Sequence, residues 1–187
     1  LSFDRLHLLK LPVPDQGWLE KWIHADELVE NKLTLEFQKI PSIHEPKIAR
    51  ILSEHLPTKA QLYCSNSMPI RDLEWFGKPS NLGRQLWGAR GVNGIDGTLG
   101  TALGIAHQSE QPTYLLTGEL AFLHDSNALL FSKQLKGSLT IFVINNNGGG
   151  IFEHLPISNE PEFEKYFVTP QNFDLSKLCA SFGIKYL

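Results

Sequence analysis

Side chains that could hold a metal ion follow two of the apolar runs that we expect to form strands. Glu119 comes just after residues 113–117, and Asn146 comes just after residues 139–144. Because the carboxyl ends of parallel strands meet at one edge of a sheet, we expect the two side chains to lie close together. A carboxylate, an amide oxygen and a nearby backbone carbonyl suit Mg²⁺, which takes its other ligands from phosphate and water. These residues predict a Mg²⁺ and phosphate site.

A further polar turn, Ser65-Asn66-Ser67, follows the expected strand 62–64 and falls at the same edge. A helix is expected to begin after Glu119, and the dipole at its N-terminus favours a phosphate group. Most of the glycines lie between residues 77 and 150, where they allow the backbone to approach a ligand closely. The sequence contains neither a GxxxxGK[ST] motif nor a GxGxxG motif, which excludes a P-loop and a nicotinamide-binding Rossmann domain.

The elements that must position these residues alternate between helix and strand. The strands are short and uniformly apolar, which is typical of a parallel sheet that helices cover on both faces. We therefore predict an α/β fold, a three-layer α/β/α arrangement around a mainly parallel central sheet. The expected strands are 62–64, 85–87, 113–117, 139–144 and a last one from 184, and the expected helices are 46–56, 68–76, 98–107, 122–135 and 175–182.

The N-terminal part of the chain carries no motif. Residues 18–28 have helical spacing, whereas Leu33, Leu35 and Phe37 alternate with polar residues as in a half-buried strand. We interpret residues 1–41 as a linker or the tail of a preceding domain, and residues 42–187 as one domain that is truncated at its C-terminus. Since residue 1 is leucine, we expect the chain to be a processed or excised piece.

Composition and charge exclude several classes of protein. The formal net charge is -3, so no basic field exists to hold a nucleic-acid backbone. No apolar run approaches the roughly 20 residues of a membrane-spanning helix, and we expect no signal peptide because no basic start followed by a long apolar stretch is seen. Cys64 and Cys179 lack CxxC spacing, so we expect reduced core thiols in a cytosol-like compartment.

Taken together, four segments resemble the thiamine diphosphate-dependent enzymes. That family carries a Gly-Asp-Gly-like turn and, after a further helix and an apolar strand, an Asn-Asn pair. The likeness is strongest to the menaquinone-pathway synthases, the MenD family, and it covers about residues 42–187. The matching segments are SNSMPIRD (65–72), RGVNGIDG (90–97), GEL (118–120) and NNNGGGIFEHLP (145–156).

The resemblance implies a thiamine diphosphate-binding fold and a role for each matching residue. The Glu119 carboxylate, the Asn146 side chain and the Gly148 carbonyl would hold Mg²⁺ (or Mn²⁺) on the cofactor's diphosphate. Ile95 would be an apolar wedge that bends the cofactor, and further cofactor contacts would come from Ser67, Asn93 and Leu120. Substrate contacts, in which the two arginines bind carboxylates, would come from Asn66, Ser67, Arg71, Arg90, Ile151, Phe152 and Leu155.

The resemblance also implies a reaction. A transferase of this kind decarboxylates 2-oxoglutarate and adds the resulting succinic semialdehyde carbanion to isochorismate, in menaquinone or phylloquinone biosynthesis in the cytoplasm or a plastid. The activating glutamate would come from an N-terminal domain of the partner subunit in a homodimer or a dimer of dimers. No catalytic residue is therefore assigned to this chain, and by itself it is expected to be inactive.

The sequence departs from the family pattern at two positions. The family has Asp at the position of Glu119, and it usually has Asn at the position of Ala89. Two alternatives stay open at this point. One is another thiamine diphosphate-dependent 2-oxoacid decarboxylase or synthase with a different acceptor. The other is a non-catalytic domain that has lost metal binding.

Overall fold

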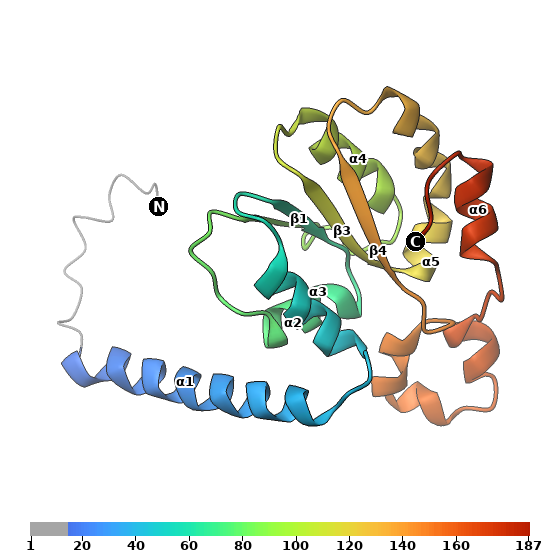
Figure 1. The fold of residues 1–187 in the computed structure, drawn as a ribbon. Helices are drawn as coiled ribbons and strands as arrows, with labels where there is room; N and C mark the ends of the chain where they lie inside the picture. Colours follow the sequence, from blue (N-terminus) through green and yellow to red (C-terminus); the bar gives the residue numbers. More distant parts are fainter. Residues whose placement is uncertain (1–14) are drawn as a thin grey trace, which may run out of the picture. The chain divides into compact units, whose positions relative to one another are not determined.

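A parallel sheet forms the centre of residues 44–187. The computed structural model describes residues 15–187, which fall into two compact units that divide between Ile43 and His44. The sheet lies in the C-terminal unit and has four strands in the order β2-β1-β3-β4 (Figure 1). They are β1 (Gln61–Cys64), β2 (Gln85–Gly88), β3 (Thr113–Gly118) and β4 (Leu139–Ile144), all parallel to their neighbours. The predicted α/β fold is confirmed.

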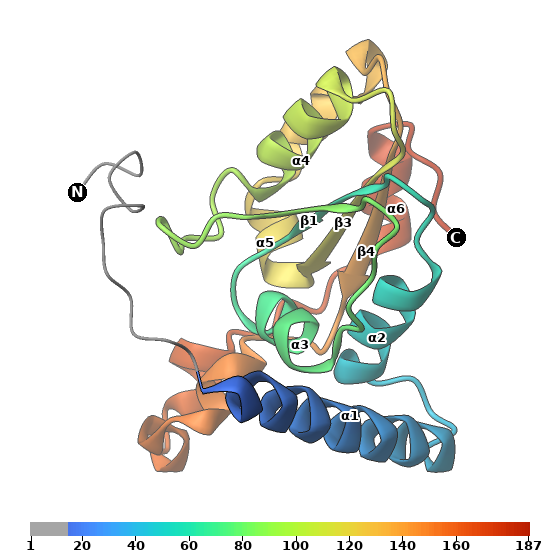
Figure 2. The same cartoon turned by 90° about the vertical axis from the view of Figure 1, so that its left-hand side faces the viewer.

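One face of the sheet is covered by α2 (Glu45–His55) and α3 (Met68–Phe76), which lie side by side (Figures 1 and 2). Leu52 of α2 and Leu73 of α3 pack in one cluster with strand residues that include Leu62 and Leu116. Cys64 is buried in the same cluster, and burial raises the pKa of its thiol to about 12. This thiol is therefore an inert core residue, as expected.

The opposite face is covered by α4 (Thr98–Gln108), α5 (Glu119–His124) and α6 (Leu175–Ser181). Leu99 of α4, Phe122 of α5 and Cys179 of α6 form a second cluster. The strands contribute Tyr63 and Leu115 to this second cluster. The residues next to them along β1 and β3 belong to the first cluster. Because side chains alternate between the faces of a strand, β1 and β3 are buried on both sides and give the three-layer arrangement.

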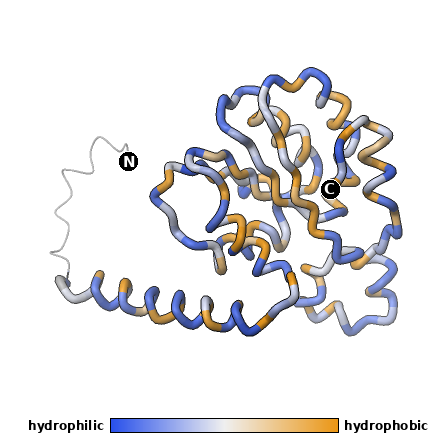
Figure 3. The backbone as a smooth tube through the Cα atoms, in the orientation of Figure 1, coloured by the Kyte–Doolittle hydropathy of each residue, from blue (hydrophilic) through white to orange (hydrophobic). Residues whose placement is uncertain are grey.

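The predicted strand at 33–37 is wrong, because these residues belong to the long helix α1 (Gln16–Lys39) of the N-terminal unit. Leu33 and Phe37 are four residues apart, so a short alternating pattern also fits one helical face. Lys32 and Lys39 pair with Glu36 at helical spacing, which favours the helix. Apolar residues recur on successive turns of α1 (Figure 3).

The predicted helix at 122–135 is correct only in part. Helix α5 begins earlier, at Glu119, and after Asp125 the chain continues as the 3₁₀ segment η2 (Ser126–Gln134). Asp125, at φ -111° and ψ 20°, lies at the junction of the two segments, and its Oδ2 accepts a hydrogen bond, at 2.8 Å, from the backbone N–H of Gly100. That N–H lies in the first turn of α4, where it has no partner within the helix.

Replacing Asp125 with alanine is expected to lower the free energy of unfolding by about 1 kcal/mol, because the N-terminus of α4 loses its acceptor. Urea denaturation of the full-length protein measures the effect. Asparagine at the same position keeps an oxygen that can accept from Gly100, so its loss should be smaller. An alanine variant as stable as the wild type would contradict this capping role of Asp125.

The strand expected from residue 184 is not formed. Gly183, at φ 70°, reverses the chain after α6, and the Ile184 N–H donates to the Cys179 carbonyl at 2.9 Å. Ile184 then packs against the second core cluster.

Between β4 and α6 lie three short helical segments, η3 (Gly150–His154), η4 (Pro156–Asn159) and η5 (Glu164–Val168). Within residues 15–187, no helix is long and apolar enough to cross a membrane.

Candidate functional site

A cavity of about 610 Å³ opens at the carboxyl ends of β1, β3 and β4. The turns that follow these strands contribute to its wall, together with the loop after β2 and the segments η3 and η5 (Figure 1). The structure brings together almost all the residues that the sequence singled out. Those that line the cavity are Asn66, Ser67, Arg71, Arg90, Asn93, Ile95, Glu119, Leu120, Asn146, Gly148, Ile151 and Phe152.

Leu155 does not line this cavity. It follows η3, and its side chain is 48% exposed. Several lining residues were missed by the sequence analysis, among them Glu45, Tyr166 and Phe167. No motif could have found Glu45, because it reaches the cavity from the start of α2. The two aromatic residues lie on η5, which follows the matching motif by several residues.

Glu119 is the buried carboxylate of the cavity, with 2% of the residue exposed. Its Oε1 accepts a hydrogen bond from the Gly148 N–H at 2.5 Å. Burial raises the pKa of the Glu119 carboxyl, and the nearby charge of Glu45 adds to the increase, while backbone N–H groups of residues 119, 148 and 146 oppose it. The first turn of α5 and the turn after β4 are thus joined through one carboxylate.

The turn after β4 has a backbone that only certain residues adopt. Asn147 has φ 62° and Gly148 has φ 150°, both positive. A Cβ atom on Gly148 would lie 2.3 Å from Val168 Cγ1 and 2.6 Å from the Val168 carbonyl oxygen. The next residue, Gly149, donates its N–H to that same carbonyl at 2.8 Å. The turn is therefore pressed against η5, and glycine at 148 is a steric requirement.

Replacing Gly148 with alanine is expected to lower the free energy of unfolding by about 1–3 kcal/mol, because backbone strain adds to the clash with Val168. Gly104, in the middle of α4, is a matched control, since a Cβ there meets nothing within 4 Å. Alanine at 104 should leave stability unchanged or raise it by up to about 1 kcal/mol. Thermal unfolding of the two variants compares them, and equal effects would contradict the argument.

Asn66 holds the loop that carries Ile95. Its Nδ2 donates to the carbonyl oxygens of Val92 and Gly94, both at 3.1 Å, and its Oδ1 accepts from Arg90 Nη1 at 3.3 Å. Asn66 is also buried. Because both ends of its amide are occupied within the protein, Asn66 shapes the wall of the cavity and has little capacity left for a ligand.

Two arginines reach the cavity from different elements. Arg71, on α3, donates from Nη1 to the Ser67 carbonyl at 2.7 Å, and Ser67 itself has φ 77°. Arg90 lies on the loop after β2. Its Nη1 also donates to Asn93 Oδ1, at 3.5 Å. Neither guanidinium forms an ion pair with a carboxylate among residues 15–187. Both therefore keep donors for an anion.

Aromatic side chains close another part of the wall. Phe152 of η3 and Phe167 of η5 meet edge to face, with ring centroids 5.8 Å apart. Phe163 stacks on Phe167, with ring centroids also 5.8 Å apart. A row of packed rings of this kind excludes water from the adjoining part of a cavity.

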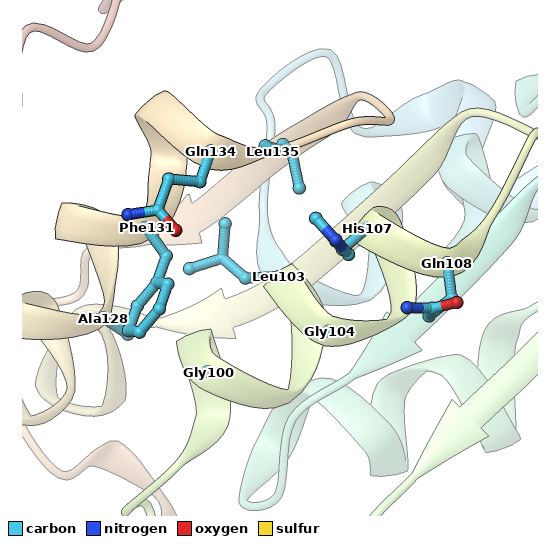
Figure 4. Close-up of a pocket in the computed structure, with 9 residues that line it drawn as sticks. All are labelled: Gly100, Leu103, Gly104, His107, Gln108, Ala128, Phe131, Gln134 and Leu135. Atoms are coloured by element: carbon cyan, nitrogen blue, oxygen red, sulfur yellow. The ribbon is translucent and has the colours of Figure 1, made fainter.

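A second cavity, of about 470 Å³, lies between α4 and η2. Leu103, Phe131 and Leu135 lie between the two elements, and His107 is the titratable residue in the lining (Figure 4). None of the residues that the sequence singled out lines it. Its wall carries no buried charge, whereas the first cavity contains the buried carboxylate of Glu119.

Comparisons with known proteins agree on one family. Residues 75–187 match the C-terminal TPP binding domain of the thiamine pyrophosphate enzymes. The chain is 47% identical over 174 residues to a 2-succinyl-5-enolpyruvyl-6-hydroxy-3-cyclohexene-1-carboxylate synthase of Synechococcus elongatus. It is 49% identical over 173 residues to the enzyme of the same name from Trichodesmium erythraeum. Each alignment takes in 92% of this chain and 30% of the relative, so the chain spans about a third of their length.

A solved structure supports the fold. The crystal structure of a proposed thiamin diphosphate-dependent enzyme from Mycobacterium smegmatis has a TM-score of 0.57 at 19% sequence identity. The likeness covers 76% of this chain and 26% of that one. At this identity it bears on the fold alone, and the family match rests on the sequence. The chain belongs to the thiamine pyrophosphate enzyme family, in its C-terminal TPP binding domain.

Proposed function

We propose that this chain holds the diphosphate and the Mg²⁺ (or Mn²⁺) ion of thiamine diphosphate within a larger synthase. The observation that carries the proposal is the convergence of Glu119, Asn146 and Gly148 on one cavity. The names of the relatives, at 45–49% identity, support the reaction of that synthase. It would decarboxylate 2-oxoglutarate and add the succinyl unit to isochorismate, in the cytoplasm or a plastid.

The donor set fits a metal ion that is shared with a diphosphate. Glu119 offers one carboxylate, Asn146 an amide oxygen and Gly148 a carbonyl oxygen. Among residues 15–187, no group of three or more His, Cys, Asp or Glu side chains could hold a metal. Three protein oxygens are too few for the roughly six ligands of Mg²⁺, so phosphate oxygens and water would complete its shell, as is usual for this ion.

The cavity also suits an organic cofactor. Its volume of about 610 Å³ falls within the roughly 300–1,000 Å³ of small-molecule sites. Ser67, Asn93 and Leu120 line it beside the proposed metal ligands. Ile95 lines it from the loop that Asn66 holds in place. We propose that Ile95 supports the bent cofactor, because an apolar branched side chain on a fixed loop makes a rigid wedge.

The two arginines suit substrates that carry carboxylates, and both 2-oxoglutarate and isochorismate carry two. A guanidinium has five N–H donors in a planar fork that matches a carboxylate. Arg71 uses one donor on the Ser67 carbonyl, which fixes its direction and leaves the others for a substrate. Ile151 and Phe152 would exclude water from the substrates. Leu155, which lies outside the lining, is not needed for this role.

When bound, thiamine diphosphate supplies the nucleophilic carbon and the electron sink for decarboxylation. The residues of this chain bind and orient the cofactor and the substrate carboxylates. The glutamate that activates the cofactor would come from another domain, supplied by the partner subunit of a homodimer or a dimer of dimers. We therefore assign no catalytic acid or base to this chain.

Calorimetry on the full-length protein tests the proposal. Thiamine diphosphate should bind in the presence of Mg²⁺ and lose most of its affinity when EDTA is added. The loaded protein should consume 2-oxoglutarate, and isochorismate should be converted only when both substrates are present. A preference for another 2-oxoacid, such as pyruvate, would point to a different synthase. No binding of the cofactor at high micromolar concentration would point to a non-catalytic domain.

A further inference from the structure

We infer that Glu45 is a positioning residue that sets the orientation of the Asn146 side-chain amide. The inference rests on the proposed function, in which Asn146 Oδ1 is a metal ligand. Glu45 is half-buried at the first position of α2 and lines the same cavity. Its Oε1 accepts a hydrogen bond from Asn146 Nδ2 at 2.8 Å, across a separation of 101 residues.

The two ends of the Asn146 amide are not equivalent. Its oxygen can ligate a cation, whereas its nitrogen carries two hydrogens and can only donate. Half a turn about the Cβ–Cγ bond exchanges the two ends with little change in shape, and the torsion that does this is soft. An unrestrained asparagine would therefore present its nitrogen to the ion for part of the time. A fixed carboxylate accepts only from the nitrogen and repels the oxygen, so it selects one orientation.

The surroundings of Asn146 leave room for this contact. A Cβ atom on Gly150 would lie 2.9 Å from Asn146 Nδ2, so a larger residue at 150 would crowd the amide. The neighbouring Asn145 turns its own Oδ1 back to the N–H of Asn147 at 3.2 Å and so shapes the turn. Among the three consecutive asparagines, Asn146 is the one that is held through its amide nitrogen by α2.

Glu45 could also assist metal binding in a second way, which differs from orienting Asn146. Its negative charge is close enough to Glu119 to contribute to the raised pKa of that carboxyl. Glu45 could therefore attract the cation through its charge alone. The two explanations differ in what they require, because orientation needs a hydrogen-bond acceptor opposite an amide, whereas attraction needs only the charge.

Four variants of the full-length protein distinguish them, with Mn²⁺ affinity in saturating thiamine diphosphate measured by electron paramagnetic resonance. We expect Glu45→Ala to weaken Mn²⁺ binding about two- to tenfold, because an even mixture of the two amide orientations costs a factor of about two, and losing an acceptor that polarises a metal ligand adds to this. Glu45→Gln should have a much smaller effect, because its amide oxygen can still accept from Asn146 Nδ2. Neither variant should change the melting temperature of the metal-free protein by much.

The third variant, Asn146→Asp, removes the amide and places a second carboxylate next to Glu45. In this background Glu45 has no N–H to accept from, and it repels the new side chain. Adding Glu45→Ala, which gives the fourth variant, is therefore expected to leave Mn²⁺ binding unchanged or to tighten it. If Glu45 acted by charge alone, the same step would weaken binding in both backgrounds.

The inference is supported if Glu45→Ala weakens Mn²⁺ binding in the wild-type background but leaves it unchanged, or tightens it, in the Asn146→Asp background. It is overturned if Glu45→Ala binds Mn²⁺ as the wild type does, or if Glu45→Gln and Glu45→Ala lose affinity equally. In either of those cases a wild type that binds Mn²⁺ and the cofactor leaves the proposed function intact. A wild type that binds neither would overturn both.

Discussion

Replacing Glu119 with alanine is expected to weaken the Mg²⁺-dependent binding of thiamine diphosphate by roughly a hundredfold or more, about 3 kcal/mol. Glu119 is the one carboxylate in the proposed ligand set, and only 2% of the residue is exposed. Its removal also leaves the Gly148 N–H without its acceptor, so the turn that carries the other two proposed ligands is less well held. Calorimetry on the full-length protein measures the loss.

Two further substitutions separate the charge of Glu119 from its shape. Glutamine keeps an oxygen that can accept from Gly148 but lacks the charge, so cofactor binding should fall almost as far as with alanine while stability is retained. Aspartate keeps the charge on a shorter side chain, and its affinity should stay within about tenfold of the wild type. A Glu119→Gln variant that binds thiamine diphosphate with wild-type affinity would contradict the proposed metal site.

Replacing Asp72 with asparagine is expected to stabilise the protein at pH 7 by about 2–3 kcal/mol. Asp72 lies in α3 with 3% of the residue exposed, and its Oδ1 has no hydrogen-bond partner. Burial raises the pKa of the Asp72 carboxyl from 3.8 to about 6, and the charge of Glu45 adds to the increase. Each unit of pKa corresponds to about 1.4 kcal/mol, so the ionised carboxylate opposes folding by roughly 3 kcal/mol.

The pH dependence of this effect has a definite sign. Between pH 4 and pH 6 the native state keeps the Asp72 proton, whereas the unfolded chain, with its ordinary pKa of 3.8, has lost it. The native state therefore binds more protons than the unfolded state, and the contribution of Asp72 to stability falls as the pH rises through this window. Above pH 6 the cost stays constant. The advantage of Asp72→Asn should appear between pH 4 and pH 6 and persist above it.

Urea denaturation at a series of pH values, with the wild type and Asp72→Asn measured in parallel, gives this difference directly. Asp174 is a control of the opposite sign. Its side chain caps α6 and accepts from Ser176, which is the main cause that lowers the pKa of the carboxyl to about 2. Asp174→Asn should therefore be less stable than the wild type at pH 7 and approach it only near pH 2. An Asp72→Asn variant that is less stable than the wild type at pH 7 would contradict the prediction.

The sequence alone determined the central sheet and most of the candidate site. The apolar runs at 113–117 and 139–144 are bounded by glycine and polar residues, and this local pattern places strand ends within a residue or so of β3 and β4. Once the strands are taken as parallel, the rule that their carboxyl ends share one edge brings Glu119, Asn146 and Ser67 together. The cavity at that edge contains all three residues.

Local patterns were insufficient where two structures satisfy the same spacing. The alternation of Leu33, Leu35 and Phe37 fits a strand, but Leu33 and Phe37 also fit one face of a helix, and the pairs of Glu36 with Lys32 and Lys39 favour the helix. The helix predicted at 122–135 changes to a 3₁₀ segment at Asp125, whose side chain accepts from a distant backbone N–H, that of Gly100. The contact of Asp125 with Gly100 joins residues 25 apart, so a short window of sequence does not show it, whereas the spacing of Glu36 with Lys32 and Lys39 is local.

Only the tertiary structure decided which groups meet across long separations and which lose their contact with water. Glu45 reaches Asn146 because the start of α2 packs beside the carboxyl edge of the sheet, a neighbour relation that residue types do not encode. Asp72 is a polar residue on a short helix, and the pKa of its carboxyl is raised because the fold buries it and brings the charge of Glu45 near. Backbone preference acts over a few residues, whereas hydrogen-bond partners and desolvation are set by packing, so the sequence located the site and the fold determined how its side chains are held.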